Sequence, residues 1–182
     1  MWVALMVINN KDDPKILLDA DVISHFIKGG QPFILPRLYP NQLVILNIVK
    51  KELKNNRNPR FKTQVDNFLK IKGVEQKDFP EDFKVKKEYA RLQKELRLHE
   101  GESACLAFAK FNENYIVASS NLSDIVQYCK ENSIRYLPTM DILMVAYNDK
   151  MLTNEECNDF ITTLKDKGCR LPCNTIEEYI SR

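Results

Sequence analysis

Short hydrophobic runs alternate with longer segments of helical spacing along most of this chain. A run buried on both faces is continuous rather than alternating, as in strands of a parallel sheet. Four runs of this kind predict strands at residues 16–20, 43–46, 115–119 and 134–137. Strands that alternate with helices predict a three-layer α/β/α domain around a mostly parallel sheet of four or five strands.

Helical spacing follows each predicted strand. Helices are expected at residues 22–28, 47–53, 61–71, 82–98, 101–111, 122–131, 139–147 and 153–167, with a short one from 175. Asn47 and Thr139 are predicted to cap their helices, and Thr153 with Glu156 predicts a capping box. Residues 31–40 contain three prolines and are expected to form a loop or a brief helical turn.

A length of 182 residues suits one domain. We expect an α/β domain over residues 1–150, with 1–14 as a candidate extra strand, and a helical extension over 151–182 packed on it. The hydrophobic N-terminal stretch, residues 1–8, is too short for a membrane span and lacks the basic region and cleavage site of a signal peptide. Five cysteines without a Cys-x-x-Cys pair do not make a zinc site, and they favour a reducing cytoplasm.

Charge is distributed unevenly, although the net charge is only +2. Residues 50–97 hold 15 Lys and Arg against 8 Asp and Glu. This basic segment is compatible with a polyanion lying over one face while carboxylates gather at another. Lys86, Lys87 and Arg91 are the cations expected to contact the polyanion. The alternative is that the segment forms ordinary solvated helices.

Four acidic positions are expected at the edge of the sheet where its strands end. Asp19 ends the first strand, Glu52 lies on the helix after the second, and residues 119–124 follow the third. Glu102 is in the first turn of a helix, where the helix dipole favours an anion. Open α/β sheets place their ligands at this edge. The alternative for Asp19 and Glu102 is a simple role at a helix start.

A cluster of oxygen ligands without His or Cys suits Mg²⁺ or Mn²⁺. Clustered carboxylates repel one another unless a cation lies between them. Two such ions, about 3.5–4 Å apart, can activate water and stabilise the leaving oxygen of a phosphodiester. The acids therefore suggest a metal-dependent hydrolase that acts on a nucleic-acid backbone.

The segments that carry these acids resemble the motifs of PIN-domain proteins, a family of metal-dependent nucleases that includes prokaryotic toxins of toxin–antitoxin pairs. The matching segments are residues 17–23, 49–53, 101–107, 116–121 and 139–143. The third is similar to the subgroup in which Glu follows Gly. The resemblance covers about residues 15–150 and implies a Mg²⁺- or Mn²⁺-dependent endoribonuclease.

The resemblance also implies roles for particular residues and partners. Asp19, Glu52 and Glu102 would bind metal and position the attacking water, with Asp124 as a fourth acid. Asn121 stands where the family usually has Asp; it offers a carbonyl ligand but removes a negative charge, which Asp21 restores in part. The implied partners are RNA, an antitoxin and a second copy of the chain.

Other functions remain as alternatives to a metal-dependent nuclease. A PIN-like protein that has lost catalysis and acts by binding is the main alternative, and Asn121 supports it. Asp19-x-Asp21 is also similar to the nucleophile loop of haloacid-dehalogenase-like phosphatases. That family needs a paired-acid motif after a later strand, and residues 119–124 contain neither an Asp-Asp pair nor a Gly-Asp. The five glycines form no dinucleotide-binding motif. His25 and His99 lack a catalytic partner in the pattern and are expected on the surface or at helix flanks.

Overall fold

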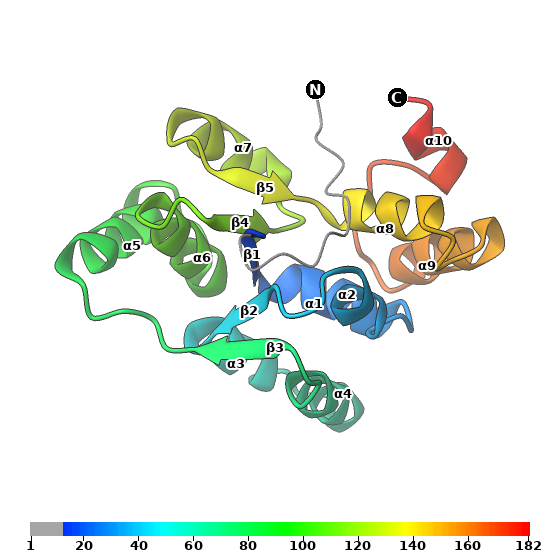
Figure 1. Cartoon of the computed structure of the whole chain (residues 1–182), viewed down its shortest axis with the longest axis horizontal. Coiled ribbons are helices and arrows are strands. Elements are labelled where there is room, and N and C mark those ends of the chain that lie inside the picture. The colour runs from blue at the N-terminus through cyan, green and yellow to red at the C-terminus, as the bar shows by residue number, and fades with distance from the viewer. Residues whose placement is uncertain (1–12) are drawn as a thin grey trace.

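Five parallel strands form one sheet in the part of the chain that the computed structural model describes, residues 13–182 without the side chains of Leu122 and Asp124. Their order in the sheet is β3-β2-β1-β4-β5. The strands are β1 (Lys15–Leu18), β2 (Leu43–Leu46), β3 (Val74–Lys77), β4 (Tyr115–Ala118) and β5 (Arg135–Leu137). Helices lie on both sides of this sheet, so the predicted three-layer fold is confirmed (Figure 1).

Strand β3 has no counterpart among the four predicted strands. Its sequence is Val-Glu-Gln-Lys, with Glu75 and Gln76 exposed, and among the described strands it pairs with β2 alone, at the edge of the sheet. Charged side chains are common on edge strands because they discourage pairing with other chains. Its polar sequence therefore contains no hydrophobic run from which a strand could be predicted. The candidate strand in residues 1–14 falls almost entirely outside the described residues.

The predicted helices are present, with small shifts at their ends. They are α1 (Ala20–Lys28), α2 (Ile34–Leu38), α3 (Asn47–Lys54), α4 (Pro59–Leu69), α5 (Phe83–Glu95), α6 (Glu100–Lys110), α7 (Leu122–Glu131), α8 (Thr139–Asn148), α9 (Asn154–Asp166) and α10 (Ile176–Ile180). The proline-containing segment forms the brief helix α2. None of the helices in the described part of the chain is long and hydrophobic enough to cross a membrane.

Two predicted N-caps are wrong for the same reason. Helices α3 and α8 follow their strands so directly that Leu46 and Pro138 occupy the cap positions, and Asn47 and Thr139 are the first helical residues. The Asn47 amide instead accepts a hydrogen bond from the N–H of Phe79, beyond β3, at 3.1 Å. The capping box of Thr153 and Glu156 at α9 is confirmed.

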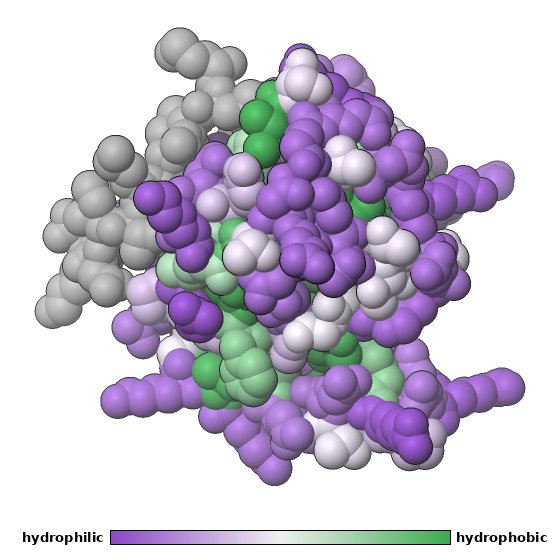
Figure 2. Space-filling view, turned by 90° about the vertical axis from the view of Figure 1, so that its right-hand side faces the viewer, coloured by the Kyte–Doolittle hydropathy of each residue, from purple (hydrophilic) through white to green (hydrophobic). Residues whose placement is uncertain are grey.

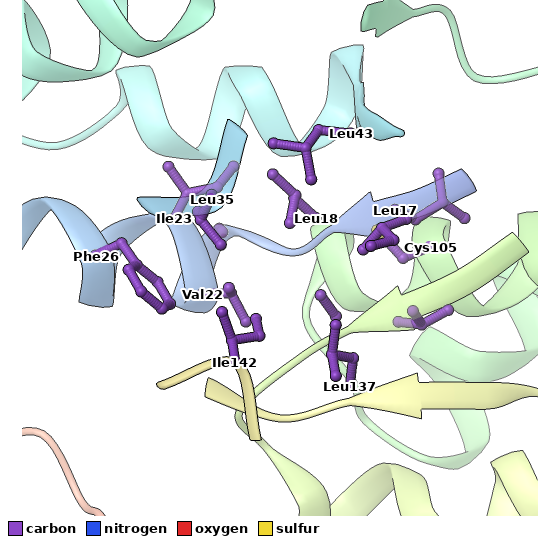
Figure 3. Close-up of a cluster of buried hydrophobic side chains, with 14 of the residues drawn as sticks. Leu17, Leu18, Val22, Ile23, Phe26, Leu35, Leu43, Cys105, Leu137 and Ile142 are labelled. Carbon is purple, nitrogen blue, oxygen red and sulfur yellow. The ribbon is translucent and has the colours of Figure 1, made fainter. Parts of the chain in front are cut away.

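The hydrophobic core surrounds β1, which is the central strand. Leu17 and Leu18 are fully buried, and side chains from α1, α6 and α8 lie around them (Figure 3). Cys105 on α6 is one of these, as expected for a small core residue. Burial of this strand on both faces fixes where its carboxyl end lies.

The register of the parallel strands brings polar residues together at their carboxyl ends. Leu18 of β1 pairs with Ala118 of β4, so Asp19 and Ser119 follow at neighbouring positions. The backbone N–H of Asp19 donates to the Ala118 carbonyl at 3.0 Å, which continues the ladder by one bond. The hydrophobic sheet thus ends in a polar edge at a defined place.

Candidate functional site

Asp19 is held at the polar edge of the sheet by both of its carboxylate oxygens. Its Oδ1 accepts a hydrogen bond from the Ala20 N–H at 2.7 Å, and its Oδ2 accepts one from the Ser119 hydroxyl at 3.3 Å. The residue caps α1, and its side chain is almost fully buried. The helix-cap role and the site role weighed for Asp19 are therefore compatible, because one oxygen caps the helix while the carboxylate faces its acidic neighbours.

Glu52 and Asp19 approach the same point beside Gly101. The Glu52 Oε2 atom accepts a hydrogen bond from the Gly101 N–H at 3.1 Å. A Cβ atom placed on Gly101 would lie 2.5 Å from Glu52 Oε2 and 3.2 Å from Asp19 Oδ1. A larger residue would force the carboxylate of Glu52, an exposed residue, to move away from this point and would crowd that of Asp19. The Gly-Glu motif at the start of α6 therefore has a steric reason for its first residue.

Glu102 follows Gly101 and is buried, with 3% of its surface exposed. Burial raises the pKa of Asp19 well above its ordinary value, and the charges of Asp21, Glu102 and Glu52 raise it further. Burial is also the main cause that raises the pKa of Glu52, with a contribution from Asp21. Four acidic side chains from three separate parts of the sequence thus act on one small region.

The buried thiol of Cys105 is affected by the same acidic side chains. Its pKa is raised well above the ordinary value by burial first, and then by the charges of Asp19, Glu102 and Glu52. Cys105 lies on α6, one turn after Glu102. All three expected metal-binding carboxylates are therefore close enough to this helix to act on the same buried group.

The donor set fits a hard divalent cation with water in its coordination shell. No three His, Cys, Asp or Glu side chains among the described residues are grouped as a complete set of metal ligands. Mg²⁺ is usually bound through one or two carboxylates and keeps several waters, so it does not need such a set. Asp19 and Glu52, which share the space that a Cβ at Gly101 would fill, are the residues that would hold the ion, with Glu102 beside them.

Asn121 lies at the N-cap of α7, after β4, on the same edge of the sheet. Its N–H donates to the Ser119 hydroxyl oxygen at 3.3 Å, and its side-chain oxygen accepts from Ser123 at 3.2 Å. The side chain of Asp124 is not among those described, so its expected role as a fourth acid stays a prediction. Asp21 is exposed and lies at the mouth of the site.

The sequence predicted that Ser119 lies at this edge of the sheet, but it did not predict the hydrogen bond between Ser119 and Asp19.

His25 was expected on the surface or at a helix flank, and this prediction is wrong, because His25 is buried in α1. Its Nδ1 atom forms hydrogen bonds with the hydroxyls of Thr139, at 3.1 Å, and Ser120, at 3.2 Å. Burial lowers the pKa of His25, which favours the neutral ring. The available signal was its position one turn after Val22, on the hydrophobic side of α1.

Comparison with known families gives a match over most of the chain. A family model described as a PIN domain matches residues 15–182. The match includes the segments of Asp19, Glu52 and Glu102, and it extends through α9 and α10. No curated protein matches the sequence.

Proposed function

The chain belongs to the PIN-domain family, which has a nuclease-type fold, and on that premise we propose that it is a metal-dependent endoribonuclease. The observation that carries the proposal is the meeting of Asp19 and Glu52 at Gly101, with the buried Glu102 next to it. Burying like charges together is costly without a counter-ion, so this arrangement is best explained by a bound cation.

Each residue of the site has a physical role in this proposal. The Ala20 N–H and the Ser119 hydroxyl fix the carboxylate of Asp19, and the Gly101 N–H fixes that of Glu52. Oxygens fixed in this way can bind a cation without first reorganising. When bound, Mg²⁺ or Mn²⁺ supplies a water of lowered pKa and stabilises the leaving oxygen of the phosphodiester. Glu102 and Asp21 add negative charge that strengthens cation binding.

The direct test is cleavage of an end-labelled single-stranded RNA. Wild type is expected to cut it with Mn²⁺ or Mg²⁺ and not with EDTA. Asp19→Asn and Glu102→Gln should each lower the rate at least about a hundredfold, because each removes a charge that holds the ion. Glu113→Gln, an exposed acid after α6, is the matched control and should cut at the wild-type rate. Equal cleavage by wild type and Asp19→Asn would refute the proposal.

The second candidate is a PIN-like protein that binds RNA without cutting it. Asn121 favours it, because an amide in place of a carboxylate leaves the site with one negative charge fewer. Binding of labelled RNA without cleavage in either metal would support this candidate. Asn121→Asp would then be expected to restore cleavage. An antitoxin partner and a homodimer stay predictions from the family resemblance, and a cytoplasmic location stays a prediction from the cysteines.

A further inference from the structure

Two hollows on the surface share a wall, which is formed by Asn56 and Phe61. The smaller hollow has a volume of about 280 Å³ and reaches the candidate site, where Asp21 and Glu52 line it. The larger has a volume of about 550 Å³ and lies at the end of α1 and the start of α4. Because they share these two residues, the hollows lie side by side; together they are called the groove, and its larger part has no acidic lining residue.

The larger hollow carries positive charge only. Lys28, Arg60 and Lys167 line it, and its other lining residues are uncharged. Lys167 Nζ donates to the backbone carbonyl of Lys28 at 2.6 Å, which holds the ammonium group at the end of α1. Within the described part of the chain, none of these three cations is in an ion pair. Their charge is therefore available to an anion.

Amide groups in the same groove are oriented by the backbone around them. The side-chain oxygen of Asn56 accepts from the Asn58 N–H at 2.9 Å, and that of Asn58 accepts from the Arg60 N–H at 3.0 Å. With their oxygens used in this way, the amide NH₂ groups are left to donate to acceptors in the groove. Phosphate and ribose oxygens are such acceptors.

The basic surface expected from the sequence is less suited to bind a phosphate backbone. On α5, Lys86 forms an ion pair with Glu81, and Arg91 forms ion pairs with Glu88 and Glu95. Lys86 and Arg91 are therefore already neutralised by acids, while Lys87 is in no ion pair within the described part of the chain. The side of the molecule that carries α4 and α9 is hydrophilic over most of its area (Figure 2). Of the cations in the basic segment of residues 50–97, Arg60 lines the larger hollow.

We propose that this groove binds the sugar–phosphate backbone of the RNA strand adjacent to the scissile phosphate. Lys28, Arg60 and Lys167 would bind phosphates outside the acidic site, and the Asn56–Phe61 wall would separate the two binding regions. This inference rests on the proposed function, because it takes RNA as the substrate. Backbone contacts of this kind position a strand without reading its bases.

The test compares two triple variants of equal charge in the full-length chain. Lys28→Gln/Arg60→Gln/Lys167→Gln removes the cations of the groove, and Lys84→Gln/Lys94→Gln/Lys130→Gln removes three exposed cations from α5 and α7. Binding of a fluorescent single-stranded RNA of about 20 nucleotides is measured by anisotropy in EDTA, so that cleavage does not interfere. Salt is varied from about 50 to 200 mM, the range over which phosphate contacts weaken strongly.

The groove variant is expected to raise Kd at least tenfold and to reduce the slope of log K against log salt by about 2, since each lost phosphate contact contributes about 0.7. The control should bind within twofold of wild type. If the groove triple variant does not fold, the three single variants are used, and each should reduce the slope by about 0.7. Equal weakening in the groove variant and the control would overturn the proposal, as would wild-type RNA binding too weak to measure.

The experiments distinguish a wrong assignment of the RNA-binding groove from a wrong assignment of the nuclease function. Wild type that binds RNA through the groove but never cuts it would refute the nuclease and leave the groove in place. Wild type that cuts RNA, with an unchanged KM in the groove variant, would refute the groove and leave the nuclease in place.

Discussion

Glu52 of α3 accepts a hydrogen bond from the backbone N–H of Gly101 in α6, although the two residues are 49 positions apart. The contact joins the two sequence motifs that contain Glu52 and Glu102, both proposed to act on the metal. It also lies beside Asp19, which comes from the first motif. A single glycine is therefore the point at which three separate segments of the chain meet.

Gly101→Ala is expected to destabilise the fold by about 1–3 kcal/mol, the usual cost of adding a methyl group to a closely packed site. The new Cβ would lie 2.5 Å from Glu52 Oε2, so the carboxylate must move away and lose its hydrogen bond. RNA cleavage should fall with it. Urea unfolding, followed by circular dichroism, measures the change in stability.

Glu52→Ala shows whether Gly101→Ala acts through its contact with the Glu52 carboxylate or through a general loss of stability in α6. In a Glu52→Ala background, Gly101→Ala should cost clearly less, because the side chain that it meets is gone. Ser103→Ala, a buried position on the same helix whose hydroxyl has no partner among the described residues, should change stability little. An equal cost of Gly101→Ala in both backgrounds would contradict the proposed clash.

Removal of the Asp19 charge should have opposite effects with and without metal. Burial and neighbouring acids raise the pKa of Asp19, which means that the ionised group is unfavourable in the folded protein. Asp19→Asn should therefore melt at a temperature equal to or above that of wild type in EDTA. In wild type, but not in Asp19→Asn, Mn²⁺ or Mg²⁺ at about 100 times Kd should add about 2.7 kcal/mol of stability.

Thermal melting with a titration of each metal measures both effects. Glu113→Gln again serves as the control and should respond to metal as wild type does. A metal-dependent rise in Tm that persists unchanged in Asp19→Asn would place the cation elsewhere on the protein.

The sequence was sufficient to predict the parallel sheet and the order of its main elements, because buried strands such as β1 and β2 are continuous hydrophobic runs. It also predicted that Asp19 and Glu52 follow strands whose carboxyl ends share one edge. The meeting of Asp19, Glu52 and Gly101 depends on long-range packing of α3 against α6, which no local pattern specifies.

The features that were missed share a physical cause. Strand β3 is stabilised by pairing with β2 rather than by burial, so its polar sequence gives no strand signal. His25 is buried because hydroxyls from two later segments satisfy its ring. Ser119 supports Asp19 only through the register of β1 with β4. Each depends on a partner that is distant in sequence.

Glu88 is expected to make stability depend on pH in the acid range. Its carboxylate accepts from Arg91 at 2.7 Å, Lys110 at 3.0 Å and Tyr128 at 2.7 Å, which connects α5, α6 and α7. The hydrogen bond with Arg91 is the main cause that lowers the pKa of Glu88 from 4.5 to about 2. Because the folded pKa is the lower one, this stabilisation is present above pH 4.5 and is lost as the pH falls toward 2.

Glu88→Gln should lower the free energy of unfolding at pH 7 by about 1–3 kcal/mol, since it removes the charged acceptor of the buried Tyr128 hydroxyl and of two partly exposed cations. It should also flatten the decline in stability between pH 4.5 and 2. Urea unfolding at several pH values provides both measurements. Glu95→Gln, which removes the exposed partner of Arg91, should cost less than about 1 kcal/mol. A Glu88→Gln curve parallel to that of wild type would contradict this role.

The contact between Tyr179 of α10 and Asp141 of α8 attaches the C-terminal helix to the rest of the protein. The Tyr179 hydroxyl donates to Asp141 Oδ1, and Asp141 is largely buried. Burial raises the pKa of Asp141, while the hydrogen bond with Tyr179 opposes that shift. Tyr179→Phe would leave a buried carboxylate without this donor, so it should destabilise the protein by about 1–3 kcal/mol.

Differential scanning calorimetry of Tyr179→Phe tests whether α10 unfolds together with the α/β domain. One transition at a lower Tm is expected, because α10 packs on both α8 and α9. Asp141→Asn in the Tyr179→Phe background should recover part of the loss, since a neutral amide costs less to bury than a carboxylate. Tyr147→Phe, on the same helix as Asp141, is the control and should leave Tm unchanged. Two separate transitions, or no recovery by Asp141→Asn, would show that this contact does not couple α10 to the domain.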